Sequence, residues 1–189
     1  MEQEIQVIEA ELAHLATEEP GITLLLSITG VGLIGAATIW GAIGDATRFK
    51  SPKQVSRYAG LDASVFQSGE QDYRGRISRN GNGQLRTVLV EAAQVIARHD
   101  VGALGAFYRR KAQQIGKGKA IVALARKLLV VAWRMLYTGE PYRALKAPVL
   151  RRKHNVIAKL SASRRDWNAV LQAVLLPAPK TRKRTRYAA

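Results

Sequence analysis

One serine and a run of arginines are the residues of this sequence whose types could do chemistry together. Ser68 precedes a glycine, and the basic, glycine-rich stretch that follows carries guanidinium groups at Arg74, Arg76, Arg79 and Arg86. A hydroxyl beside guanidinium groups could attack a phosphodiester, because they would stabilise the charge that builds on phosphorus. Ser-Gly is also ordinary turn chemistry. Spacing alone favours a turn serine in a basic nucleic-acid-binding loop and leaves the nucleophile as the alternative.

The composition limits the other kinds of site. The 189-residue chain has no cysteine, which excludes a disulfide framework and a thiolate zinc site. Its histidines, His14, His99 and His154, are far apart and show no metal-ligand spacing. The basic turn at residues 116–119 lacks the Walker spacing, which excludes a P-loop nucleotide hydrolase. The sequence therefore predicts no metal and no cofactor within this chain.

The charge distribution indicates a polyanionic partner. The formal net charge is +16 and the pI about 10.7, a balance typical of nucleic-acid-binding proteins. Residues 1–47 contain seven acids and neither lysine nor arginine. We therefore expect phosphate contacts from Arg48 and Lys50 onward, and a different role for the start of the chain.

The first residues have the pattern of a coiled-coil helix. Over residues 2–19, apolar side chains recur at the 3/4 spacing of a seam, and glutamates cover the other faces. So short a seam is not stable alone, so we expect a homo-oligomer through residues 1–19 or a longer helical hairpin. A surface helix packed on its own domain is the alternative. The seam positions are Ile5, Ile8, Leu12 and Leu15.

Residues 21–44 carry no charge, and that length could span a bilayer. Their glycines, threonines and serine argue against a membrane helix, so we expect no membrane partner. The preferred interpretation is two short helices joined by residues 29–32, the pattern of a helix-hairpin-helix motif. Gly30 and Gly32 would let the backbone approach a phosphate, which free N–H groups of the second helix would bind. A plain helical hairpin in the core is the alternative.

Helical patterns continue along the chain. Ser51, Pro52 and Gln54 form a full helix-start signature. Residues 69–83 are predicted as an irregular loop or a short hairpin. No strand alternation is longer than about four residues, so the predicted fold class is all-α. The predicted helices beyond residue 50 cover residues 51–59, 83–99, 101–113, 119–137 and 168–175.

Composition divides the chain into three parts. A coiled-coil or linker helix covers residues 1–19, a main domain residues 20–143, and a basic, partly disordered tail residues 144–189. The last 50 residues hold thirteen lysines and arginines and two acids. We expect this tail to contact nucleic acid through phosphates.

Motifs in one order resemble a known family. They are the stretch 26–33 with 48–61, then Gln67-Ser68-Gly69, then the basic stretch 76–86. As a set they look like the C-terminal domain of insertion-sequence transposases of the IS one-ten family, also called one-sixteen and nine-oh-two. The resemblance covers about residues 20–143.

The resemblance implies a DNA recombinase guided by a bridge RNA. In that family a serine of this domain attacks DNA and forms a covalent phosphoserine, and the matching position is Ser68. Ser78, inside Arg-Ile-Ser-Arg, fits a conformational or backbone-contact role better. The implied partners are DNA and a guide RNA, and the implied location is cytoplasmic and nucleoid-associated.

The resemblance also implies a metal that this chain does not hold. The family has an N-terminal RuvC-like domain whose four acids hold magnesium beside the serine, in an active site built from two protomers. This chain begins in the helical linker that follows such a domain, so magnesium is expected only together with a RuvC-like domain.

Two functions follow. The chain is the catalytic half of a serine-type transposase, or a non-catalytic DNA- or RNA-binding remnant of one. A ribosome-associated helical protein would fit the charge but would leave the ordered motifs unexplained. Replacing Ser68 with alanine separates the first two, because only the first needs the hydroxyl.

Overall fold

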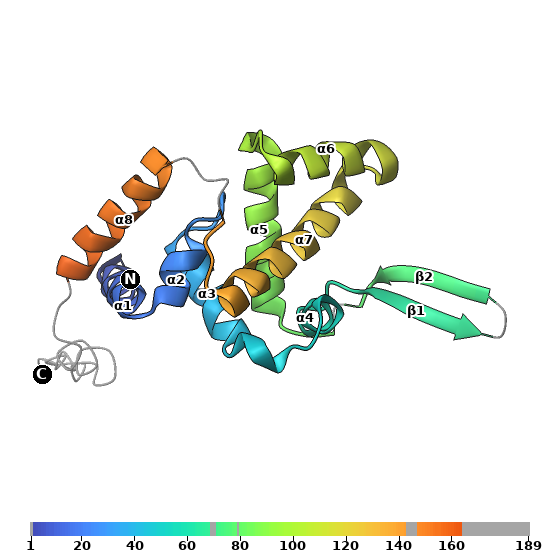
Figure 1. Cartoon of the computed structure of the whole chain (residues 1–189), viewed down its shortest axis with the longest axis horizontal. Helices are drawn as coiled ribbons and strands as arrows, with labels where there is room; N and C mark the ends of the chain where they lie inside the picture. Colours follow the sequence, from blue (N-terminus) through green and yellow to red (C-terminus); the bar gives the residue numbers. More distant parts are fainter. Residues whose placement is uncertain (1, 69–70, 79, 143–146, 164–189) are drawn as a thin grey trace, which may run out of the picture.

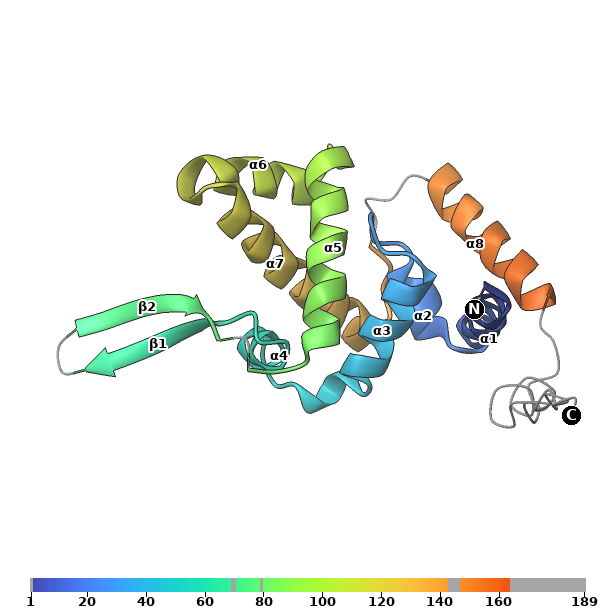
Figure 2. The same cartoon turned by 180° about the vertical axis from the view of Figure 1, so that it is seen from behind.

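The computed structural model describes residues 2–68, 71–78, 80–142 and 147–163. They form a helical body, from which a two-stranded hairpin projects on one side, while a pair of helices lies on the other (Figure 1; seen from behind in Figure 2). In chain order the elements are α1 (Glu2–Glu18), α2 (Pro20–Leu25), α3 (Leu33–Ile43), the 3-10 turn η1 (Ala46–Arg48), α4 (Pro52–Tyr58), β1 (Ala63–Ser68), β2 (Gln71–Ile77), α5 (Gly83–His99), α6 (Ala103–Ile115), α7 (Lys117–Thr138) and α8 (Ala147–Ala162).

Helix α7 is the centre of the body. Helices α2, α4, α5 and α6 pack against it, and Leu124, Leu128 and Ala132 are fully buried. The indole Nε1 of Trp133 donates a 2.9 Å hydrogen bond to the carbonyl oxygen of Ala46, which fixes η1 to this helix. The prediction of a core helix over residues 119–137 is confirmed.

The start of α4 follows the predicted signature. The Ser51 hydroxyl accepts a 3.4 Å hydrogen bond from the Gln54 N–H, and the Gln54 side-chain oxygen accepts a 2.7 Å bond from the Lys50 N–H. One free donor of the helix, the Gln54 N–H, and the N–H of Lys50 just before the N-cap are thereby satisfied.

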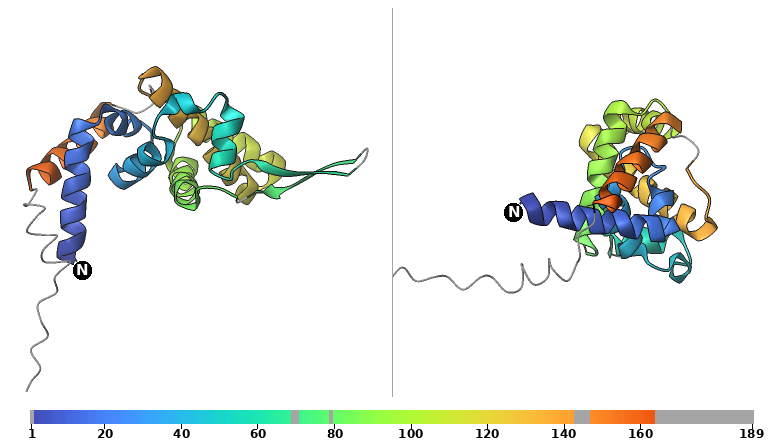
Figure 3. Two further views of the ribbon diagram at one scale, coloured as in Figure 1. Left: turned by 90° about the horizontal axis from the view of Figure 1, so that it is seen from below. Right: turned by 90° about the vertical axis from the view of Figure 1, so that its left-hand side faces the viewer.

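Helix α1 packs on its own chain, beside α8 and against α2 and α3 (Figure 3). Its buried positions are the small residues Ala10, Ala13 and Ala16, whereas Ile5 and Ile8 remain 52% and 53% exposed. Helix α1 therefore packs on its own domain, which is the alternative that the sequence left open. A seam with a second copy stays a prediction.

Helix α8 lies within the region that the sequence predicted as a basic tail. Ile157 is buried in the common core, and Leu150 and Leu160 pack against that core. The high cation content of this stretch favoured a tail, and the apolar stripe of Leu150, Ile157 and Leu160 at helical spacing was missed. The predicted helix over residues 168–175 lies outside the described residues.

Strands β1 and β2 form one antiparallel ladder with an irregularity between Ala63 and Val65. The sequence allowed a short hairpin within residues 69–83, but the first strand begins earlier, at Ala63. The all-α class is confirmed for the body, to which this hairpin is attached. Within the described residues, no helix combines the length and apolar character that crossing a membrane requires.

Candidate nucleic-acid interface

Ser68 is the last residue of β1, at the end of the hairpin that is distant from the helical body (Figure 1). Its Cα pairs with that of Gln71, the first residue of β2. Arg74 pairs with Val65 in the same ladder, and Arg76 lies near the end of β2. The fold therefore brings Ser68, Arg74 and Arg76 onto one projecting ribbon. Arg79 lies outside the described residues.

The base of the hairpin is held by Asp62. The Ser78 hydroxyl donates a 2.8 Å hydrogen bond to one Asp62 carboxylate oxygen, and the Ser78 N–H donates a 2.9 Å bond to the Asp62 carbonyl. The Arg57 Nε lies 3.4 Å from the other carboxylate oxygen. The Ser78 hydroxyl thus joins the two ends of the hairpin, which supports the conformational role that its motif position suggested.

A second junction joins the hairpin to α5. The Asn82 side chain caps this helix by accepting a 3.0 Å hydrogen bond from the Leu85 N–H, while the Asn82 N–H donates a 2.9 Å bond to the Tyr58 carbonyl. Gly81 has a φ of +151°, and a Cβ there would collide with the Tyr58 carbonyl oxygen. The Arg86 Nη1 donates a 3.2 Å bond to the Ala59 carbonyl. Arg86 therefore helps to position this junction, whether or not it also meets a phosphate.

Arg48, the last residue of η1, stacks on Phe49 and on Tyr58 at the end of α4. Its guanidinium lies 4.5 Å from the ring centre of Phe49 and 4.7 Å from that of Tyr58, and its Nη2 donates a 2.8 Å hydrogen bond to the Ala42 carbonyl. Hydrogen bonds from Arg48 and then Asn82 lower the pKa of the Tyr58 hydroxyl. The exposed Arg48 is thus a packing residue of the hairpin's support, and Lys50 beside it is also exposed.

The two glycines of the α2–α3 turn differ in what they do. Gly30 has a φ of +79°, and a Cβ there would lie 2.8 Å from the Ala92 carbonyl oxygen of α5. Gly32 is the exposed N-cap of α3, with open space where a Cβ would be. Gly30 is therefore required for packing. The phosphate-binding helix-hairpin-helix motif is not confirmed and remains a prediction for both glycines.

Lys153 of α8 is the residue at this turn that sequence reasoning missed. Its ammonium donates hydrogen bonds of 2.8, 3.0 and 2.7 Å to the carbonyl oxygens of Leu26, Ile28 and Val31. Burial lowers the pKa of Lys153 to about 8. A contact across more than 100 residues leaves no local signal, and one lysine in a basic stretch does not stand out.

The comparisons with known proteins agree with the motifs. A family model described as transposase IS116/IS110/IS902 family matches residues 22–109. This range contains every residue that the sequence singled out for the site. The chain therefore carries the domain of this transposase family over residues 22–109.

Curated relatives are transposases and DNA-inverting proteins by name. A putative transposase, y4rJ of Sinorhizobium fredii, is 38% identical over 67% of this chain and 33% of its own length. The transposase for insertion sequence element IS1111A of Coxiella burnetii is 30% identical over 71% of this chain and 38% of its own length. The pilin gene-inverting protein of Moraxella bovis is 32% identical over 70% of this chain and 40% of its own length. The chain thus spans between a third and a half of the length of these relatives.

Proposed function

We propose that this chain is the part of a DNA transposase that binds DNA and supplies Ser68 as the nucleophile of strand transfer. The supporting observation is the position of Ser68 at the end of a strand that projects from the body, with Arg74 and Arg76 on the paired strand. A two-stranded ribbon is narrow enough to enter the major groove of DNA. Such a ribbon would carry a hydroxyl to a backbone that the broad helical body cannot reach.

The proposed chemistry is a transesterification. The Ser68 Oγ attacks the phosphorus of a DNA phosphodiester, a serine–phosphate bond forms, and the bond from phosphorus to one sugar oxygen breaks. The released sugar oxygen gains a proton and serine loses one, so the step balances without an external reactant. Arginines near the reacting phosphate would stabilise the charge on its equatorial oxygens.

The phosphoserine ester would allow the strands to be rejoined. A second sugar hydroxyl can attack the same phosphorus and release the serine, so no bond is lost to water. The name of the Moraxella bovis relative, a pilin gene-inverting protein, fits this chemistry, because inversion of a DNA segment needs strands to be cut and rejoined.

No metal held by the described residues of this chain takes part in the proposed step. The described residues contain no group of three or more His, Cys, Asp or Glu that could hold a metal. Asp72 lies on β2 opposite Gln67. Asp62, at the base of the hairpin, already accepts from Ser78 and lies beside Arg57. The residues present do not fit a two-metal centre. We therefore keep the proposal that magnesium is held by a RuvC-like domain.

We further propose a guide RNA and a second copy as partners. The net charge of +16 supports contact with two nucleic acids. The exposed Ile5 and Ile8 support a homo-oligomer through residues 1–19, because a second α1 would cover them. Such a complex would act at the nucleoid, where the DNA is.

The test is a trapping assay. The full chain is mixed with element-junction DNA, guide RNA, magnesium and a separately expressed RuvC-like domain, and covalent protein–DNA adducts are counted on denaturing gels. We expect an adduct with the wild type and none with Ser68→Ala. Ser64→Ala, which removes a hydroxyl from the same strand, is the matched control and should keep the adduct.

Two outcomes would contradict the proposal. An adduct that survives Ser68→Ala would place the nucleophile elsewhere. If an intact relative forms an adduct under the same conditions and this chain forms none, a nucleic-acid-binding remnant becomes the better account.

A further inference from the structure

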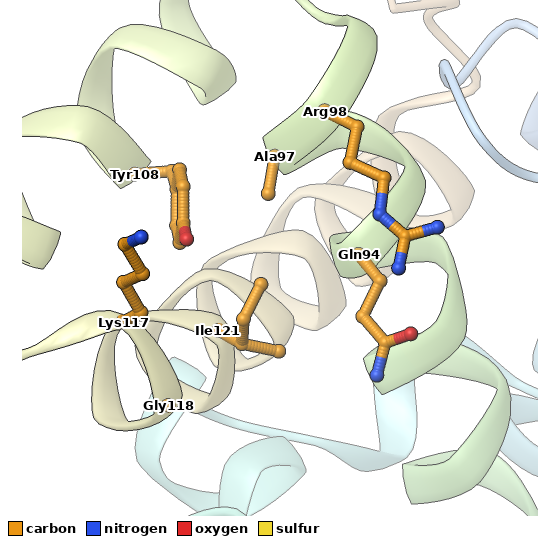
Figure 4. A pocket seen from close by; sticks show the side chains of 7 residues that line it. All are labelled: Gln94, Ala97, Arg98, Tyr108, Lys117, Gly118 and Ile121. Carbon is orange, nitrogen blue, oxygen red and sulfur yellow. The ribbon is translucent and has the colours of Figure 1, made fainter.

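A basic cavity lies on the helical body, outside the hairpin and its supports. Its volume is about 340 Å³, and it lies between the end of α5, the middle of α6 and the start of α7. Figure 4 shows Arg98 and Gln94 on one side, Lys117 and Tyr108 on the other, and Ala97 and Ile121 between them. None of the residues that line it is acidic.

The cations of this cavity are not engaged elsewhere. Among the described residues, Arg98 and Lys117 make neither an ion pair nor a side-chain hydrogen bond, and both are exposed. Asp100, two residues after Arg98, instead accepts from the N–H groups of Gly102 and Gly105. Two cations across one hollow, without a counter-charge in its lining, favour an anion between them.

The rest of the cavity lining fits a nucleobase as well as an anion. Tyr108 and Ile121 are half-buried and give the hollow an aromatic and an aliphatic surface. The Gln94 amide, which makes no hydrogen bond within the described chain, offers a donor and an acceptor together. Proteins bind unpaired bases by stacking them on aromatic side chains beside a positively charged path for the backbone.

We propose that this cavity takes one unstacked nucleotide of a single strand. Arg98 and Lys117 bind the phosphates on either side of it, the base lies against Tyr108, and Gln94 bonds to the base edge. A duplex keeps its bases stacked and cannot offer one to the cavity. The single strand is DNA or RNA, because the chemistry that the cavity presents is common to both.

This inference rests on the proposed function only in taking nucleic acid as the partner. The two can fail separately. If the chain forms no covalent adduct with DNA but a base still stacks on Tyr108, only the proposal of Ser68 as nucleophile is contradicted. If the adduct forms but no base stacks on Tyr108, only the proposal for the cavity is contradicted.

The first experiment separates the cavity from general charge. The double variant Arg98→Gln/Lys117→Gln is compared with Arg126→Gln/Arg134→Gln, which removes two exposed cations from α7 outside the cavity. Fluorescence anisotropy with a fifteen-nucleotide oligo-dT is measured at one salt concentration. We expect the cavity variant to lose roughly tenfold or more in affinity and the control roughly threefold at most. Equal losses would overturn the proposal.

The second experiment tests stacking. Tyr108→Leu keeps an apolar side chain and should weaken binding of the single strand roughly 5- to 150-fold, since a stacked base contributes about 1–3 kcal/mol. A strand with 2-aminopurine should be quenched by the wild type and not by Tyr108→Leu. An affinity and a quenching that Tyr108→Leu leaves unchanged would overturn the proposal, as would an equal loss for a duplex. Oligo-dT and oligo-rU, compared in parallel, distinguish DNA from RNA as the source.

Discussion

Helix α7 packs against four other helices and buries Leu124, Leu128 and Ala132 completely. Strands β1 and β2, in contrast, pair only with each other in the described part of the chain. A lone two-stranded hairpin is marginally stable in water. The proposed nucleophile is therefore carried by the element with the least support of its own.

The supports of the hairpin that the described residues show lie at its base. Asp62 joins Ser78 and Arg57 there, and Gly81 lies against the end of α4. The comparison teaches that contacts with the body fix where the hairpin starts. Each prediction below tests one side of this comparison.

The largest effect is expected in the body. Leu128→Ala should lower the free energy of unfolding by about 2–5 kcal/mol, because it leaves a cavity at a fully buried position of α7. Ser68→Ala should change it by less than about 0.5 kcal/mol. Urea denaturation of both variants measures this. A Ser68→Ala variant as unstable as Leu128→Ala would show that the hairpin supports the body.

The next effect is at the base of the hairpin. Gly81→Ala should cost about 1–3 kcal/mol, because the new methyl group meets the Tyr58 carbonyl and the φ of +151° is strained. Gly41→Ala in α3, where nothing lies within 4 Å, should instead stabilise by about 0.5–1 kcal/mol. Thermal unfolding distinguishes the two directions. If Gly81→Ala raises the melting temperature, or if both variants shift it equally, the new methyl group does not collide with the Tyr58 carbonyl.

A smaller effect is expected at the Ser78–Asp62 contact. Ser78→Ala removes one hydrogen bond to a carboxylate, which should cost about 1–2 kcal/mol. Hydrogen exchange of the residue 78 amide, which is bonded to the Asp62 carbonyl, should become faster. The adduct yield should fall without disappearing. A complete loss of adduct with normal amide protection would return Ser78 to the candidates for the nucleophile.

The smallest effect concerns Lys153 and pH. Burial lowers its pKa from the ordinary 10.5 to about 8, so between these values the unfolded chain holds the proton and the folded chain releases it. The Lys153 contribution to stability is constant below about pH 8 and rises from there to 10.5. Partial exposure screens the group, so we expect a gain under about 1 kcal/mol.

Urea denaturation of the wild type and Lys153→Met at pH 7 and pH 10 measures this gain. It is the change in unfolding free energy of the wild type between the two pH values minus the same change for Lys153→Met. Lys159→Met, an exposed lysine of the same helix, is the control and should leave the difference between the two pH values as in the wild type. A wild type that loses stability relative to Lys153→Met on going to pH 10 would show that the three carbonyl contacts favour the charged ammonium more than burial opposes it.

Local patterns predicted the helices well. The capping signature at Ser51 and Gln54 gave the start of α4, and apolar spacing gave α7 within about two residues of its bounds. Both signals are contained within a few turns of chain, so they can be seen without knowledge of distant contacts. The ordered motifs, also local, gave the family.

Contacts between distant parts of the chain could not be predicted. The sequence offered Gly30, Arg48 and Arg86 as phosphate ligands, and the structure gives each a packing or positioning role as well. Charge and residue type do not say whether a guanidinium meets solvent or a neighbouring ring. The strands at residues 63–77 have ordinary lengths but show no alternation longer than about four residues, so their pattern did not distinguish them from a loop.

The sequence by itself determined a basic helical domain of a transposase family and a serine beside arginines. Those properties depend on composition and on spacing along the chain. Only the tertiary structure decided that Ser68 ends a projecting strand, that Ser78 holds its base, and that Lys153 closes the α2–α3 turn. Each of these is set by groups that are distant in sequence and meet only because burial of the helical core brings them together.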